Sequence, residues 1–154
     1  MEIDAVSPPV GGCMASYRPV IKHEYYPSGC LKQTHTFVGD KLDGKLTTYF
    51  DYGMIESESM FHNGLKHGLS RVYYTTGILY KHANFIEGRA HGRYFEYNPQ
   101  GIMAISANYC NGIISGNFKQ YNNYGQTSVD MEYENGRAIK KSIMGFNCTV
   151  GGHC

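Results

Sequence analysis

The sequence contains no tryptophan, only 5 prolines and no long hydrophobic run among its 154 residues. A helix that spans a bilayer needs about 20 consecutive apolar residues, and the longest apolar runs here, such as SIMGF, are far shorter. The N-terminal residues MEIDAVSPPV lack the basic start and apolar centre of a secretory signal peptide. We therefore expect a protein without a transmembrane segment that is not secreted and is located in the cytoplasm.

An excess of charge of one sign is also absent. The 14 lysines and arginines nearly balance the 13 aspartates and glutamates, which leaves a formal net charge of +1. Such a chain has no general attraction to a nucleic-acid backbone or to an anionic membrane. We expect no nucleic-acid partner, and any electrostatic partner must be recognised by a local patch.

Closely spaced cysteine pairs are missing as well, since the 5 cysteines include no CxxC motif. An odd number without such a pair argues against a secreted disulfide framework, so we expect mostly free thiols. A disulfide between the chain ends, or to another chain, stays open because three of the five lie in the end segments: Cys13, Cys148 and Cys154.

Metal-binding and catalytic patterns are not found. Cys148, His153 and Cys154 supply only three ligands, without a second pair at the spacing of a zinc site. His67 and His91 share a repeat position, which places them about 10 Å apart on neighbouring hairpins. No nucleophile stands in a catalytic signature, and GRAHGRYF lacks the lysine and the helix of a phosphate-binding loop. We expect no metal, no cofactor and no enzymatic activity.

Glycine and tyrosine, in contrast, are abundant, with 19 and 14 residues. Glycine recurs every 24 residues without an insertion, so the chain contains five repeats. A tyrosine stands four residues before each of these first glycines, and an aromatic residue stands eight residues after it. The first glycines are Gly29, Gly53, Gly77, Gly101 and Gly125. The tyrosine column is Tyr25, Tyr49, Tyr73, Tyr97 and Tyr121, and the second aromatic column is Phe37, Phe61, Phe85, Tyr109 and Tyr133.

Two further glycine columns follow in most repeats. The second glycine is Gly64, Gly88, Gly112 or Gly136, with Gly39 one position early in the first repeat. The third glycine is Gly44, Gly68, Gly92 or Gly116. Segments such as YTTGIL place the first glycine where a tight hairpin turn needs positive φ. Segments such as NGLKHG, which hold the second and third glycines, predict a longer polar loop that returns the chain to the next strand.

The residues between the turns alternate with period two. Leu31, Ile55, Leu79 and Met103 begin one apolar face, which the second aromatic column continues, and polar residues occupy most positions between them. Such alternation predicts strands with one apolar face, and we expect the second aromatic column to form the protein's own core. The prediction is an all-β fold: an elongated antiparallel β-hairpin repeat sheet or solenoid of five 24-residue repeats over residues 23–141. Residues 1–22 are expected to form an N-terminal cap or arm, and residues 142–154 a C-terminal tail.

The repeat resembles the MORN repeat, in particular its second variant, whose units look like YYxxGxLxxxxxYxxGxxxG. Residues 25–141 carry the resemblance in YYPSGCLKQTHTFVGDKLDG, YFDYGMIESESMFHNGLKHG, YYTTGILYKHANFIEGRAHG, YNPQGIMAISANYCNGIISG and the degenerate YNNYGQTSVDMEYENGRAIK. Repeats of this type occur in antitoxin-like bacterial proteins, in membrane-associated scaffolds and in large DNA viruses. The resemblance implies a scaffolding or binding role, in the cytoplasm or inside a virus particle.

Two surfaces are candidates for that role. The tyrosine column could bind a protein partner, because aromatic side chains dominate protein interfaces. Cations near the second and third glycines could line one edge of the sheet and meet lipid headgroups or an acidic protein, although a solvated edge that discourages aggregation explains them as well. These cations are Lys66, Arg71, Arg89 and Arg93.

The main functional hypothesis is a structural component of a larger assembly, possibly a virion, held by several protein partners. An antitoxin-like inhibitor of one partner and a phospholipid-associated scaffold are the alternatives. Self-association of the chain also stays open.

Overall fold

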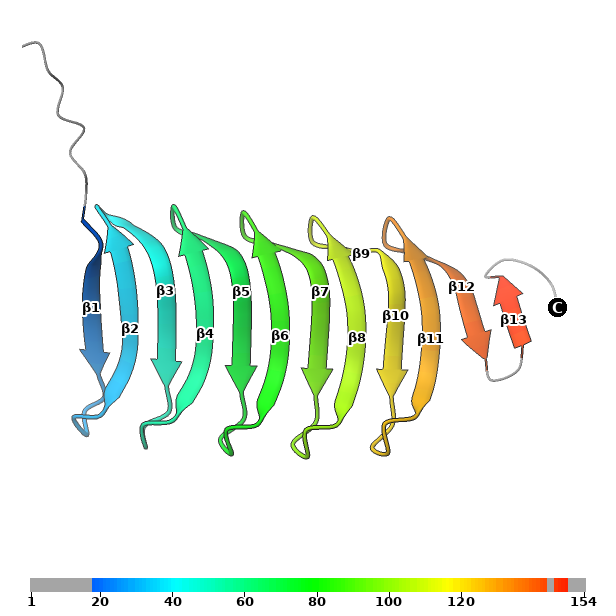
Figure 1. Cartoon of the computed structure of the whole chain (residues 1–154), viewed down its shortest axis with the longest axis horizontal. Coiled ribbons are helices and arrows are strands. Elements are labelled where there is room, and N and C mark those ends of the chain that lie inside the picture. Colours follow the sequence, from blue (N-terminus) through cyan, green and yellow to red (C-terminus); the bar gives the residue numbers. More distant parts are fainter. Residues whose placement is uncertain (1–17, 144–145, 150–154) are drawn as a thin grey trace, which may run out of the picture.

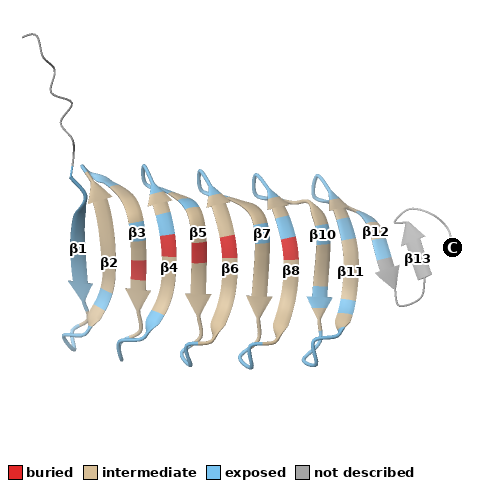
Figure 2. Cartoon of the chain, viewed as in Figure 1, coloured by how far each residue is buried: buried red, intermediate tan, exposed pale blue. Residues whose placement is uncertain are grey.

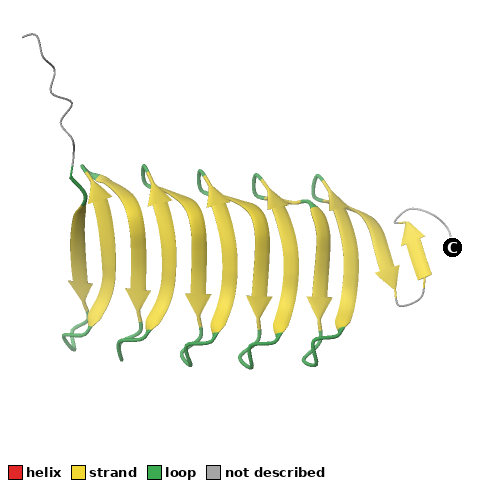
Figure 3. Cartoon of the chain, in the orientation of Figure 1, coloured by secondary structure: helices red, strands yellow, loops and turns green. Residues whose placement is uncertain are grey.

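The computed structural model describes residues 18–143 and 146–149, and every regular element in these ranges is a β-strand (Figure 1, Figure 3). The strands form one antiparallel sheet in which sequence neighbours are spatial neighbours; only the short β9 lies off this path and pairs with β8. The predicted all-β hairpin architecture is confirmed as one open sheet. The strands are β1 (Val20–Tyr25), β2 (Leu31–Val38), β3 (Lys41–Tyr49), β4 (Ile55–His62), β5 (Leu65–Tyr73), β6 (Leu79–Ile86), β7 (Arg89–Tyr97), β8 (Met103–Cys110), β9 (Ile113–Ile114), β10 (Gly116–Tyr121), β11 (Thr127–Glu134), β12 (Arg137–Ile143) and β13 (Phe146–Thr149).

The first glycine of each repeat closes a three-residue hairpin loop. In the loop between β5 and β6, the Tyr74 N–H donates to the Ile78 carbonyl and the Gly77 N–H donates to the Tyr74 carbonyl, both at 2.8 Å. Gly77 has a φ of +81°, in the left-handed region that side chains disfavour. This is the pattern of a type I turn followed by a glycine bulge. The predicted hairpin turns are therefore confirmed.

The second glycine lies in a two-residue turn rather than in the predicted longer loop. Asn63 and Gly64 have φ values of +51° and +84°, as a type I′ turn requires, and Leu65 already belongs to β5. The prediction of a polar return loop was wrong because an Asn-Gly pair reverses the chain within two residues. This turn is also linked to the preceding repeat, since the Gly64 N–H donates to the carbonyl of Leu42 in β3 at 2.8 Å.

The third glycine lies within a strand, opposite an aromatic residue of the next one. Gly68 of β5 pairs with Phe85 of β6, and Gly68 has a φ of +97°. The register between β4 and β5 shifts nearby, between Ser59 and Phe61, which is the signature of a β-bulge. The other repeats have the same pairing: Gly44 with Phe61, Gly92 with Tyr109 and Gly116 with Tyr133.

Very little of the sheet is buried. Among the described residues, the buried hydrophobic side chains are Ala83 and Ala107, at 3% and 2% exposure. Figure 2 shows buried positions only near the middle of the central strands. The second aromatic column is half-buried rather than buried, because no second layer covers the sheet within the part that the structure describes. The expectation that this column forms a core is therefore not met.

The described parts of both terminal segments continue the sheet. Residues 20–22, in the predicted N-terminal arm, begin β1, and residues 142–143 and 146–149, in the predicted tail, belong to β12 and β13. The rest of both segments lies outside the described residues. Within the described ranges, no helix is long and apolar enough to cross a membrane.

Candidate interaction surface

The tyrosine column lies at the strand ends just before the first-glycine turns. Tyr73 is the last residue of β5 and pairs with Leu79, the first residue of β6. The column is half-buried except for Tyr25 at the N-terminal end of the sheet, which is 61% exposed. The Tyr73 hydroxyl donates to a carboxylate oxygen of Glu58 at 3.3 Å. Part of each of these tyrosines thus packs on the sheet, and part remains available to a partner.

The residue after the column tyrosine connects neighbouring repeats. The Tyr26 hydroxyl donates to the Tyr49 carbonyl at 2.8 Å, and the Tyr74 hydroxyl donates to the Tyr97 carbonyl at 2.9 Å. Both bonds join residues 23 positions apart. This role was not predicted from the sequence, although the paired aromatics at 25–26 and 73–74 were a signal for it.

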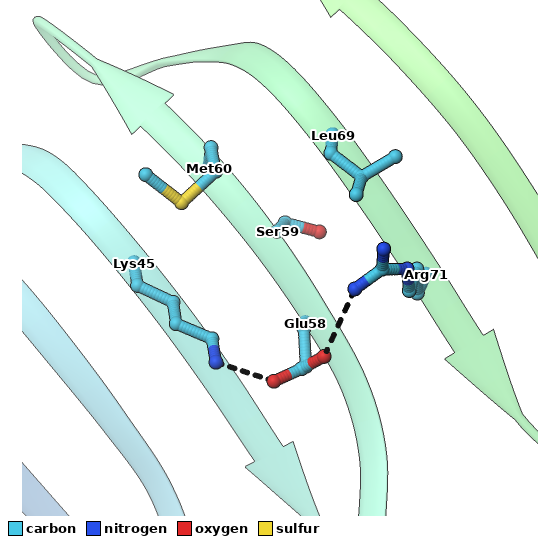
Figure 4. Close-up of a pocket in the computed structure, with 6 residues that line it drawn as sticks. All are labelled: Lys45, Glu58, Ser59, Met60, Leu69 and Arg71. Carbon is cyan, nitrogen blue, oxygen red and sulfur yellow. Dashed lines mark ion pairs between the residues drawn. The ribbon is translucent and has the colours of Figure 1, made fainter.

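A cluster of charges lies between β3, β4 and β5 (Figure 4). The Lys45 ammonium forms an ion pair with Glu58, and Arg71 Nη1 lies 4.0 Å from the same carboxylate. The Glu58 side chain is only 18% exposed. The hydrogen bond from Lys45, with smaller contributions from its charge, Tyr73 and Arg71, lowers the pKa of Glu58 although burial opposes this. Glu58 is therefore ionised at neutral pH and satisfied by its own neighbours.

The charge cluster borders an open depression of about 230 Å³, which Met60 and Leu69 also line. Ser59 is at this place as well, but its Oγ lies 2.8 Å from the Oγ of Ser70 and has no base beside it. A hydroxyl without a base is not an activated nucleophile. The lining of this depression combines the paired charges of Lys45, Glu58 and Arg71 with the apolar side chains of Met60 and Leu69.

The four cations predicted to line one edge do not form one row. Lys66 and Arg89 lie beside the second-glycine turns, and the Lys66 ammonium lies 5.3 Å from the centre of the Phe85 ring. Arg71 lies well inside β5 and faces Glu58, and Arg93 lies in the middle of β7. The difference follows from the short second turn, which places these residues in strands instead of a loop. Their charges are consequently dispersed over the sheet.

Apolar side chains, in contrast, are exposed along both long edges of the sheet. Tyr52 and Met54 lie in a first-glycine turn, and Tyr124 in another such turn is 88% exposed. Leu65 and Ile113 follow second-glycine turns and are also exposed. These positions were not predicted from the sequence, because a single apolar residue beside a turn forms no pattern. Together with the tyrosine column, which is half-buried apart from the exposed Tyr25, they place apolar side chains along both long edges of the sheet.

Metal ligands do not converge in the part of the chain that the structure covers. Residues 18–143 and 146–149 contain no group of three or more His, Cys, Asp and Glu side chains that could hold an ion. Of Cys148, His153 and Cys154, for which the sequence predicts no metal site, His153 and Cys154 lie outside these ranges. Cys30 and Cys110 are exposed free thiols.

Comparison with known proteins does not assign the chain to a family. No protein-family model matches the sequence, and no curated protein matches it.

Proposed function

We propose that this chain is a non-catalytic MORN-type repeat module that binds other proteins as a structural component of a larger assembly, in the cytoplasm or inside a virus particle. The observation that carries the proposal is the single-layer sheet with just two buried hydrophobic residues among those described. A sheet with an apolar face is stabilised when another layer covers that face. A protein partner is the simplest source of that layer.

The distribution of charge supports a protein partner over a lipid surface. The cations of the candidate edge are dispersed, and Arg71 is engaged by Glu58. The exposed side chains along the long edges are mainly aromatic and aliphatic instead. Aromatic and large aliphatic groups contribute most of the binding energy at protein interfaces.

The test is the mass and composition of the native particle that contains this chain, obtained by gentle extraction, size separation and mass spectrometry. Comigration with many copies of one or a few large structural proteins is the expected result. A free monomer would contradict the proposal. A one-to-one complex with one small toxic protein would favour the antitoxin-like alternative instead.

A matched pair of variants ties that result to the surface. Leu65→Asp combined with Ile113→Asp places charge at two exposed edge positions and should release the chain from the particle. Asp40→Asn changes an exposed residue in the turn between β2 and β3 and should leave the chain bound. Equal retention of both variants would exclude this edge as the contact surface.

A further inference from the structure

β1 is an edge strand with a free side. It lies at one end of the sheet (Figure 1) and, among the described residues, pairs with β2 alone. All six of its residues, VIKHEY, are exposed. The backbone groups along such an edge can form hydrogen bonds with another strand, and native proteins normally block or occupy them. No proline interrupts β1. The register shift between Glu24 and Tyr25 leaves the extra residue, Lys32, on β2, so β1 itself is uninterrupted and its edge is open to pairing.

Simple geometry restricts how two copies of this strand can pair. Residues directly opposite each other in a sheet point to the same face. In an antiparallel dimer whose twofold axis is perpendicular to the sheet, each residue therefore lies opposite a residue whose number differs from its own by an even number. A residue must then lie on the axis, opposite itself. Two registers of this kind keep five of the six strand residues paired, one centred on Lys22 and one centred on His23.

The charges distinguish the two registers. Centring on Lys22 places two lysines directly opposite each other, which is unfavourable. Centring on His23 places Lys22 of each copy opposite Glu24 of the other, twice in the dimer. The same register places Ile21 opposite Tyr25, which are 61% exposed each. Opposite charges and an aromatic beside a β-branched residue are both favourable cross-strand pairs.

We propose that β1 is a self-complementary edge through which two copies of this chain pair antiparallel, with His23 on the twofold axis. The sheet of one copy then continues into the sheet of the other. The dimer adds a self-association site to the protein-binding surface described above and does not depend on the identity of the other partners.

The contacts within one copy are compatible with this pairing. Glu24 accepts a hydrogen bond from Gln33 at 2.6 Å and lies 3.2 Å from His35 Nε2, both on the β2 side. Its side chain remains 54% exposed, so the carboxylate can also meet a lysine from the opposite side. The Lys22 ammonium lies 4.6 Å from the centre of the Phe37 ring on the same face of the sheet. Because six residues bury far less area than the roughly 1,200 Å² of a stable interface, the dimer should be weak and reversible.

Charge reversal in the full chain tests the register. Lys22→Glu and Glu24→Lys each place two like charges directly opposite each other at both 22–24 pairs of the dimer. Each variant should therefore raise the dissociation constant of the dimer at least about tenfold. A mixture of the two variants restores opposite charges at both pairs and should form a mixed dimer. The double variant, with both substitutions in one chain, should again self-associate. Sedimentation velocity over a wide concentration range measures all four cases, and circular dichroism confirms that each variant folds.

Crosslinking provides a second, independent readout. In a chain with all native cysteines changed to serine, His23→Cys should form an intermolecular disulfide, because opposite Cα atoms lie about 4.5–5.5 Å apart. Lys22→Cys is the matched control, since the two copies of position 22 are diagonal neighbours about 7–8 Å apart. Peptide mass spectrometry identifies the linked position.

Three outcomes would overturn the proposal. The unmodified chain could be monomeric at every concentration, as it would be if another part of the chain covers β1. The reversal variants could dimerise as well as the unmodified chain, which would place any self-association elsewhere. Crosslinking could occur through position 22 in preference to position 23, which would exclude the register.

Discussion

The hydroxyl of Tyr74 donates a hydrogen bond to the backbone carbonyl of Tyr97, 23 residues further along the chain, at 2.9 Å. Tyr26 makes the equivalent bond to Tyr49. The described part of the sheet buries few side chains, so such bonds add to the backbone ladders that join one hairpin to the next.

Tyr74→Phe should lower the free energy of unfolding by about 1 kcal/mol, the usual net value of one hydrogen bond. For a chain of this size that corresponds to a decrease in the melting temperature of about 2–4 °C. Tyr124→Phe is the control, because Tyr124 is 88% exposed. Thermal unfolding followed by circular dichroism compares the two, and an equal melting temperature for both variants would contradict the assigned role.

Substitution of the third glycine should depend on its neighbour. Gly92→Ala and Gly44→Ala both place a side chain at positive φ, which costs about 1–2 kcal/mol. A Cβ at Gly92 meets nothing within 4 Å, whereas one at Gly44 lies 3.0 Å from Cβ of Thr36. The position of Cβ in Thr36 is fixed by its backbone, so a change of side-chain rotamer cannot relieve this contact. Gly44→Ala should therefore lose more stability than Gly92→Ala in urea unfolding, and the reverse order would show that the strand relaxes around position 44.

Glu58 should make stability depend on pH in the acid range. Its pKa is lower in the folded protein than the ordinary 4.5, chiefly because of the hydrogen bond from Lys45. The folded state therefore binds this proton less tightly than the unfolded state. The resulting stabilisation is complete above the ordinary pKa and is lost as the pH falls through the folded value.

Glu58→Gln should lower the free energy of unfolding by about 1 kcal/mol at pH 7 and reduce its decrease on acidification. Asp130→Asn is the matched control, since Asp130 pairs with Lys119 at 3.2 Å but is more exposed, and exposed pairs contribute less. Urea unfolding between neutral and acid pH measures both variants. Identical pH profiles for Glu58→Gln and the unmodified chain would exclude Glu58 as the responsible group.

Tyr94 should make stability depend on pH in the alkaline range. Burial, together with a hydrogen bond to Glu96, raises its pKa to about 12. The folded state then retains a proton that the unfolded state loses near pH 10. This part of the stability is complete below pH 10 and is lost as the pH rises towards about 12.

Tyr94→Phe should remove that alkaline loss and one late-titrating phenol from the near-ultraviolet absorbance titration. Tyr124→Phe is the matched control and should leave the late-titrating phenol of Tyr94 in place. An unchanged number of phenols titrating near pH 12 in Tyr94→Phe would assign that pKa to another tyrosine.

Much of the hairpin repeat could be predicted because its requirements are local. A first glycine such as Gly77 is required by the backbone conformation of its own turn. The alternation of apolar and polar residues after that turn indicates which residues share a face of the sheet. The second turn was misjudged because the polar residues after Gly64 look like loop residues in sequence. Only the pairing of β4 with β5 shows that they belong to a strand.

The candidate surface was less predictable because it depends on contacts between repeats. Arg71 appears in sequence as one more cation near a glycine, yet in the sheet it lies beside Glu58 from the preceding strand. The Tyr74 bond to Tyr97 joins two residues whose relationship depends on how far successive hairpins are displaced. Spacing along the chain gives the repeat but not the partner of a given side chain.

By itself, the amino-acid sequence determined the 24-residue period, the glycine turns, the all-β class and the shared face of alternating residues, because these follow from the conformational needs of single residues and short segments. The tertiary structure alone decided that the sheet stays open, with two buried alanines among the described residues, and that the third glycine lies opposite an aromatic residue. It also decided that β1 is the first strand of the sheet and, within residues 18–143 and 146–149, pairs on one side only. These properties depend on which strands become neighbours, and that relationship exists only once the hairpins have stacked.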